Sequence, residues 1–124
     1  NDWHLILALN YSSRNEIVDA ARELAKKAMQ GKLYPEDIEW EDIEQNLYTN
    51  GLPDPDLIVR TSGENRLSNF LLMQSAYAEF YFTPTCWPDF TKAHLQEAID
   101  SYHSRERRFG RTGEQLGRET TLSL

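Results

Sequence analysis

The sequence predicts an α/β fold in which a parallel sheet carries helices on both faces. Three short apolar runs, Leu5–Leu9, Asp56–Arg60 and Glu79–Phe82, have the length and composition of strands. Segments with helical periodicity separate these runs, and this alternation implies right-handed crossovers between parallel strands. Three such strands alone would leave a hydrophobic edge uncovered, so we expect residues outside this chain to supply further strands.

The N-terminal part of the chain is expected to contain one strand and two helices. Leu5–Leu9 is continuously apolar, which is typical of a strand covered on both faces. Ser13 and Glu16 have capping-box spacing, and the apolar stripe that follows stops before Gly31, so a helix is predicted between them. The acidic range Glu36–Asn46 keeps apolar residues at helical spacing, which predicts an amphipathic helix with a solvated face.

A strand, a polar turn, a helix and a second strand are predicted between residues 57 and 82. Arg60 ends the first of these strands, and Gly63 allows the backbone to turn sharply after it. The helix is expected to begin near Ser68. A helix that starts at the carboxyl end of a parallel strand offers free N–H groups to an anion.

The polar residues of this turn suggest an anion site. Arg60, Arg66 and Ser68 would converge at the predicted helix start, and two guanidiniums with a hydroxyl suit a phosphate or diphosphate. Alternatively, the arginines only pair with Asp56 and Glu64 on a solvated loop. A generic phosphate-binding module of the Walker type is disfavoured, because no glycine-rich loop with Lys before Ser or Thr is present.

The last predicted helix follows Trp87, with Asp89 as its N-cap. His94 falls on the apolar face of this helix, so it is expected to pack in the protein and not to bind a metal. Residues 111–124 are expected to form a polar tail.

Composition narrows the class of ligand. The 124 residues carry a formal net charge of -7, which argues against a general nucleic-acid binder. Positive charge is locally dense near residue 108, and such a confined patch suits a small anion. Cys86 is the single cysteine, so no internal disulfide can form and a cytoplasmic location is expected. No apolar run approaches the roughly 20 residues of a transmembrane span.

Several motifs resemble the cis-prenyltransferases, the undecaprenyl diphosphate synthase family. They are Ala8-Leu-Asn-Tyr11 with Arg14, Arg60-Thr-Ser-Gly-Glu64, Arg66-Leu-Ser-Asn-Phe70, Ala78-Glu-Phe-Tyr-Phe82, Trp87-Pro-Asp-Phe90 and Arg105-Glu-Arg-Arg-Phe-Gly110. The resemblance covers nearly the whole chain, and it implies that residues 1–110 are the C-terminal half of a single catalytic α/β domain. It implies condensation of isopentenyl diphosphate with an allylic diphosphate, as in the synthesis of undecaprenyl-type lipid carriers.

The resemblance also implies roles for particular residues. Arg60, Arg66 and Ser68 would bind the diphosphate of isopentenyl diphosphate, and Glu79 would be a ligand of Mg²⁺. An alternative for Glu79 is an ion pair with a nearby arginine. Arg108 and Gly110 resemble the element that reaches the diphosphate in a neighbouring subunit, so a homodimer is expected. The alternative is that Arg108 and Gly110 only form the end of a helix, where basic residues suit the helix dipole.

The family's N-terminal phosphate loop, with its essential aspartate, is absent from these residues. The resemblance therefore implies that this chain alone has no catalytic activity. It also implies that these residues do not indicate the chain length of the product. A membrane-spanning segment is not expected, although the lipid product implies peripheral contact with a membrane. An alternative function is that of a non-catalytic partner subunit of the same fold, but such partners typically lose much of the arginine and serine set that this chain keeps.

Overall fold

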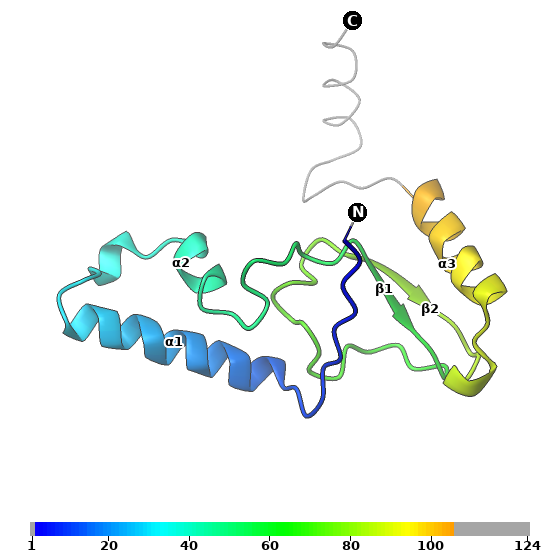
Figure 1. Ribbon diagram of the computed structural model, residues 1–124, viewed down its shortest axis with the longest axis horizontal. Helices are drawn as coiled ribbons and strands as arrows, with labels where there is room; N and C mark the ends of the chain where they lie inside the picture. Colours follow the sequence, from blue (N-terminus) through cyan, green and yellow to red (C-terminus); the bar gives the residue numbers. More distant parts are fainter. Residues whose placement is uncertain (1, 106–124) are drawn as a thin grey trace, which may run out of the picture. The chain divides into compact units, whose positions relative to one another are not determined.

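The computed structural model describes residues 2–105, which form two compact units (Figure 1). The first unit contains the residues up to Pro53 together with Leu67–Met73. The second contains Asp54–Arg66 and the described residues from Gln74 onward. The chain therefore leaves the first unit, returns to it for a short segment, and leaves it again.

The helix α1, Ser13–Met29, is the main element of the first unit. The predicted helix is confirmed, but its N-cap is Ser12, whose Oγ accepts a hydrogen bond from the backbone N–H of Asn15 at 3.2 Å. Lys26 and Lys27 lie in the last turn, where positive charge complements the helix dipole.

The acidic range forms two short helices where the sequence predicts one. A 3₁₀-helix, η1, covers Pro35–Asp37, and α2 covers Trp40–Glu44. Glu39 between them is extended, because its backbone N–H donates to the Asp42 carboxylate at 2.9 Å and so caps a new helix. The local capping bond interrupts the longer helix that the apolar spacing favours.

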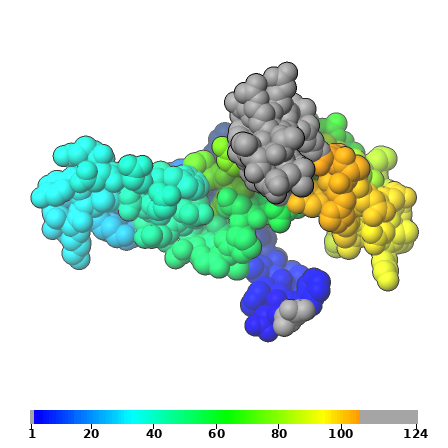
Figure 2. All heavy atoms as spheres, turned by 90° about the horizontal axis from the view of Figure 1, so that it is seen from above, coloured from blue at the N-terminus to red at the C-terminus, as the bar shows by residue number. Residues whose placement is uncertain are grey.

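Leu5–Leu9 is not a strand in this structure, which corrects the first strand prediction. Its leucine and isoleucine side chains are between 60% and 88% exposed. The N-terminal residues, blue in Figure 2, project from the rest of the first unit. A strand is defined by its partner, and the described residues of the first unit include no strand with which this run could pair.

The second unit contains a parallel pair of strands, as predicted. β1, Leu57–Arg60, pairs with β2, Glu79–Phe82, in a register that sets Leu57 opposite Glu79 and Arg60 opposite Phe82. The helix α3, Lys92–Ser104, packs against both strands and buries Ala98 completely. The α/β class is thus confirmed, with two strands in the described residues and not three.

The helix predicted to begin near Ser68 is absent, since the chain forms bends and turns from Asn69 through Tyr77. Ser68, Asn69 and Leu71 have φ values of 52°, 64° and 48°, which a right-handed helix does not permit. The prediction of an anion-binding helix N-terminus at this place is therefore wrong.

The start of α3 also differs from the prediction. Asp89 belongs to a 3₁₀-helix, η2, Trp87–Asp89, and Thr91 is the N-cap of α3. His94 accepts a hydrogen bond from the Thr91 backbone N–H at Nδ1, at 3.0 Å, and its ring stacks on Phe90. The predicted packing role of His94 is confirmed, and a capping role is added to it.

None of the helices within residues 2–105 combines the length and the apolar character that a membrane crossing requires.

Candidate functional site

Arg60 is the last residue of β1, and the turn after it is fastened to the loop that follows β2. The carbonyl of Arg60 accepts a hydrogen bond from Thr83, whose carbonyl in turn accepts one from Gly63, both at 3.0 Å. Ser62 donates to the carbonyl of Thr85 at 2.9 Å. Gly63 has the positive φ, 70°, that its predicted role in the turn requires. These bonds fix the first half of the backbone that joins Arg60 to the second arginine of the turn.

Arg66 ends this turn with an exposed side chain. Its Nε lies 3.6 Å from a carboxylate oxygen of Glu64, and the two side chains are 79% and 48% exposed. The pairing that the sequence left open is thus present for Arg66. A solvent-exposed ion pair of this kind contributes about 1 kcal/mol at most. It would not prevent the guanidinium from binding a more highly charged anion.

Ser68 lies in the first unit, whereas Arg60 and Arg66 lie in the second. The side chain of Ser68 is exposed, and the segment that carries it passes the first turn of α1 (Figure 1). There, the backbone N–H of Leu72 donates to the Oγ of the buried Ser13 at 3.0 Å. The ring of Phe70 meets that of Tyr11 edge to face, with 5.7 Å between the centroids.

Glu79 is the first residue of β2, and its carboxylate lies beside Arg105. The Arg105 Nη1 is 3.4 Å from Oε2 of Glu79, and it also donates to the carbonyl of Phe80. The Glu79 side chain is 23% exposed. The ion pair that the sequence left as an alternative is therefore present.

The surroundings of Glu79 fit a contribution of one carboxylate to a magnesium site. No group of three or more His, Cys, Asp or Glu residues gathers anywhere in residues 2–105 in a way that could hold a metal. Mg²⁺ needs few protein ligands, since water and substrate phosphates commonly complete its octahedron. Glu79 is accessible enough to supply one such oxygen. Arg108 and Gly110, also predicted to bind substrate, lie outside the described residues.

Glu16 is a buried carboxylate whose role sequence reasoning missed. It is 0% exposed, and it accepts hydrogen bonds from the Tyr11 hydroxyl at 2.5 Å and from the backbone N–H of Tyr48 at 2.7 Å. Burial and the Glu16 carboxylate together raise the pKa of Tyr11. The capping-box spacing of Glu16 predicts a local contact at the helix start. Instead, the carboxylate points inward and connects α1 to Tyr48, which follows α2 in the chain.

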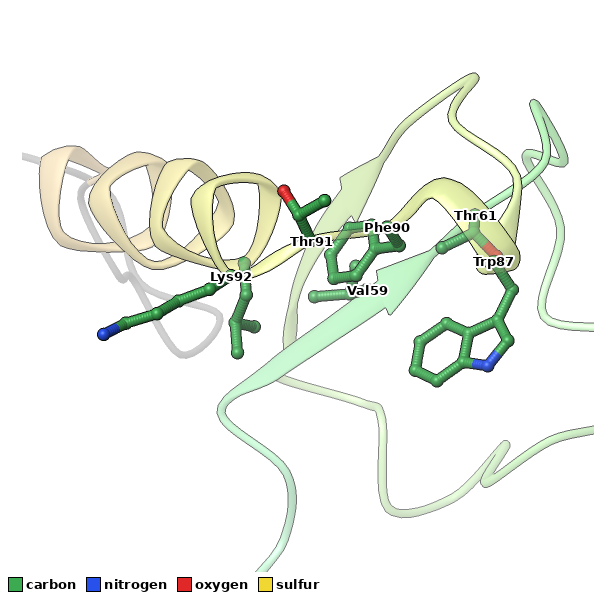
Figure 3. Close-up of a pocket in the computed structure, with 7 residues that line it drawn as sticks. Val59, Thr61, Trp87, Phe90, Thr91 and Lys92 are labelled. Carbon is green, nitrogen blue, oxygen red and sulfur yellow. The ribbon is translucent and has the colours of Figure 1, made fainter.

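A hollow of about 380 Å³ lies in the second unit, between β1 and the start of α3 (Figure 3). Val59, Phe90 and Trp87 supply apolar side chains to it, and Lys92 extends away from it. None of the predicted substrate-binding or metal-binding residues that the structure describes lines this hollow. Its apolar lining does not suit a diphosphate.

Comparisons with known proteins agree on one family. The family profile for undecaprenyl diphosphate synthase matches residues 1–110. The chain is 54% identical over 112 residues to an isoprenyl transferase from Porphyromonas gingivalis, covering 90% of this chain and 44% of that protein. It is 50% identical over 111 residues to a geranylgeranyl-diphosphate-specific tritrans,polycis-undecaprenyl-diphosphate synthase from Thermoplasma volcanium, covering 90% and 43%.

A solved structure gives the same result. The crystal structure of lavandulyl diphosphate synthase from Lavandula x intermedia, in complex with dimethylallyl diphosphate, matches with a TM-score of 0.78. The sequences are 50% identical, and the match covers 81% of this chain and 43% of that one. The chain thus spans less than half the length of the relatives it matches.

Proposed function

Because this chain belongs to the undecaprenyl diphosphate synthase family, we propose that it is the C-terminal part of a cis-prenyltransferase. The full-length protein would condense isopentenyl diphosphate with an allylic diphosphate to make a polyprenyl diphosphate for a lipid carrier. The names of its relatives support this reaction class, and the lavender enzyme binds dimethylallyl diphosphate, an allylic diphosphate.

The observation that carries the proposal is the turn after β1, with its arginines. In the condensation one diphosphate leaves, while that of isopentenyl diphosphate stays on the product, so a set of cations has to hold the retained group throughout. Arg66 is exposed and makes a weak contact to Glu64, and Arg60 ends the strand from which the turn begins. We assign these two residues and Ser68 to the retained diphosphate, since charge-assisted hydrogen bonds bind such groups strongly.

Glu79 is proposed to supply an oxygen ligand to Mg²⁺. When bound, Mg²⁺ would offset the negative charge of the allylic diphosphate and so help it to leave. Arg105 holds the carboxylate near the start of β2 from one side. Arg108 and Gly110 are proposed, from the resemblance alone, to reach the diphosphate bound by a second copy of the chain.

We also propose that the full-length protein is a cytoplasmic homodimer. Its lipid product would bring it into peripheral contact with a membrane. The sedimentation coefficient of the full-length protein tests the dimer, and a monomer at working concentration would contradict it. Fractionation of cells would test the location.

Replacement of the arginines tests the diphosphate assignment. In the full-length protein, Arg60→Ala or Arg66→Ala is expected to raise the KM for labelled isopentenyl diphosphate about tenfold to a hundredfold, as expected from the loss of a charge-assisted hydrogen bond. Arg22→Ala is the matched control for Arg66, because Arg22 is 72% exposed and pairs with Asp19 at 3.5 Å. Unchanged KM values in both variants would refute the assignment.

The same assay separates the enzyme from its alternative. A non-catalytic partner subunit would incorporate no label by itself, and its addition would stimulate a separate catalytic chain. A protein that incorporates label alone, and loses this on replacement of Arg60 or Arg66, is the enzyme.

A further inference from the structure

Asn69 caps the helix α1 although 57 residues separate it from the helix's N-cap, Ser12. Its backbone carbonyl accepts a hydrogen bond from the N–H of Ser13 at 3.0 Å, and its Oδ1 accepts one from the N–H of Arg14 at 2.9 Å. Its Nδ2 donates to the Oγ of Ser12 at 2.8 Å. The first N–H groups of a helix lack partners within the helix, and Asn69 satisfies two of them.

The backbone around Asn69 needs such anchoring. Asn69 and its neighbour Ser68 are both in the left-handed region, and Leu71 is as well. Asn tolerates this conformation better than most residues, but Ser and Leu adopt it at a cost that surrounding contacts have to offset. On the far side of Leu71, the bond from Leu72 to Ser13 supplies a second anchor.

The bonds of Asn69 to α1 restrain the preceding residue, Ser68, from its C-terminal side. The Asn69 side chain and carbonyl face α1, so the peptide that joins Ser68 to Asn69 is fixed at one end. Ser68 itself is exposed. The segment forms no helix, so the orientation of the serine depends on restraints such as the bonds of the adjacent Asn69.

We propose that Asn69 is a positioning residue for substrate binding, which acts by holding Ser68 in its left-handed conformation through the cap on α1. The inference rests on the proposed function, because Ser68 is assigned there to the diphosphate. Asn69 does not touch the substrate. Its side chain is suited to the task because it accepts from one backbone group and donates to a hydroxyl at once.

A double-mutant cycle in the full-length protein tests the proposal, with labelled isopentenyl diphosphate as the probe. Asn69→Gly removes the capping side chain but still permits a positive φ, so it isolates the cap. Ser68→Ala and Asn69→Gly are each expected to raise KM about tenfold, with a smaller change in kcat. If Asn69 acts through Ser68, the double variant has a KM no higher than the larger single effect.

Asp42→Ala is the matched control, because it removes a side-chain acceptor from the first turn of α2, in the same unit. If Asn69 had a purely structural role, Asp42→Ala would raise KM as much as Asn69→Gly does. The proposal is overturned if the two variants behave alike, if Asn69→Gly leaves KM unchanged, or if the single effects multiply to about a hundredfold. If Ser68→Ala alone has no effect, the proposal fails while the arginine assignments stand.

Amide hydrogen exchange keeps the proposal testable whether or not the protein turns over. In Asn69→Gly, exchange at Ser13 and Arg14 is expected to accelerate several-fold, and in Asp42→Ala it is expected to stay as in the parent protein. Unchanged protection of both amides in Asn69→Gly would contradict the capping role of the Asn69 side chain. A parent protein that incorporates no label, with the exchange result as expected, would refute the proposed function and leave the cap intact.

Discussion

Glu16 in the first unit and Glu79 in the second are two carboxylates in contrasting surroundings. Glu16 is completely buried, and each of its oxygens accepts a hydrogen bond at 2.7 Å or less. Glu79 is 23% exposed and lies 3.4 Å from Arg105. The buried carboxylate of the first unit therefore holds parts of that unit together, whereas the carboxylate of the second unit remains accessible to a ligand.

The largest expected effect follows from removal of the buried carboxylate. Glu16→Ala leaves the Tyr11 hydroxyl and the Tyr48 N–H without their acceptor, so we expect the free energy of unfolding to fall by about 3 kcal/mol. Urea unfolding measures this value. Glu23→Ala is the control, because Glu23 pairs with Lys26 on the surface of the same helix, and it should cost about 0.5 kcal/mol or less. Similar losses in both variants would contradict the structural role of Glu16.

The second-unit carboxylate should behave in the opposite way. Glu79→Ala removes one partly exposed ion pair, so we expect the free energy of unfolding to change by about 1 kcal/mol at most. The concentration of Mg²⁺ that gives half-maximal incorporation of labelled isopentenyl diphosphate should rise. A magnesium titration measures this concentration, and an unaltered titration curve would contradict the assignment of Glu79 as a metal ligand. Arg105→Ala separates the two roles, because it breaks the pair and retains the carboxylate.

The smallest expected effect concerns the pH dependence of the first unit. The pKa of Tyr11 is raised above its usual value of 10.0, so the folded state retains this proton more firmly than the unfolded state does. The associated stability is fully present below the unfolded-state pKa and is lost as the pH rises through the folded-state pKa. Tyr11→Phe should therefore flatten the alkaline decline in the free energy of unfolding.

The effect of Tyr11 is best measured in a Tyr48→Phe background, because a hydrogen bond to Asp19 raises the pKa of Tyr48 as well. Urea unfolding at a series of alkaline pH values is the measurement. An equally steep decline with and without the Tyr11 hydroxyl would show that this group is not responsible.

Elements that depend on local sequence were predicted well. The helix α1 has its own cap and apolar stripe, and β1 and β2 are apolar runs bounded by turn residues. Their residues contain the information that positions them. The motifs that resemble the family were likewise local, and the family match over residues 1–110 confirms what they indicated.

Features that depend on distant partners were not predicted. Leu5–Leu9 has the composition of a strand, but composition does not provide a neighbouring strand. The helix expected near Ser68 is replaced by left-handed residues, which are held by bonds to α1. Asn69 gave one signal that could have been used, since Asn is a residue that both caps helices and accepts positive φ.

The candidate site shows the same division. The position of Arg60 at the end of a strand and the turn at Gly63 followed from the sequence. The sequence leaves open a pairing of Arg66 with Glu64 and an arginine partner for Glu79, and the structure contains both. That this partner is Arg105, which lies 26 residues away, could only come from the structure.

The return of Leu67–Met73 to the first unit has a consequence for dissection of the protein. A protease cut, or an expression boundary, after Pro53 would separate α1 from the asparagine that completes its cap. Neither unit can therefore be excised as one continuous piece of chain with all its contacts retained. Fragments made in this way should have a frayed N-terminus of α1. A shortened protein that keeps these contacts would need Leu67–Met73 to be reattached to the first unit through a new linker.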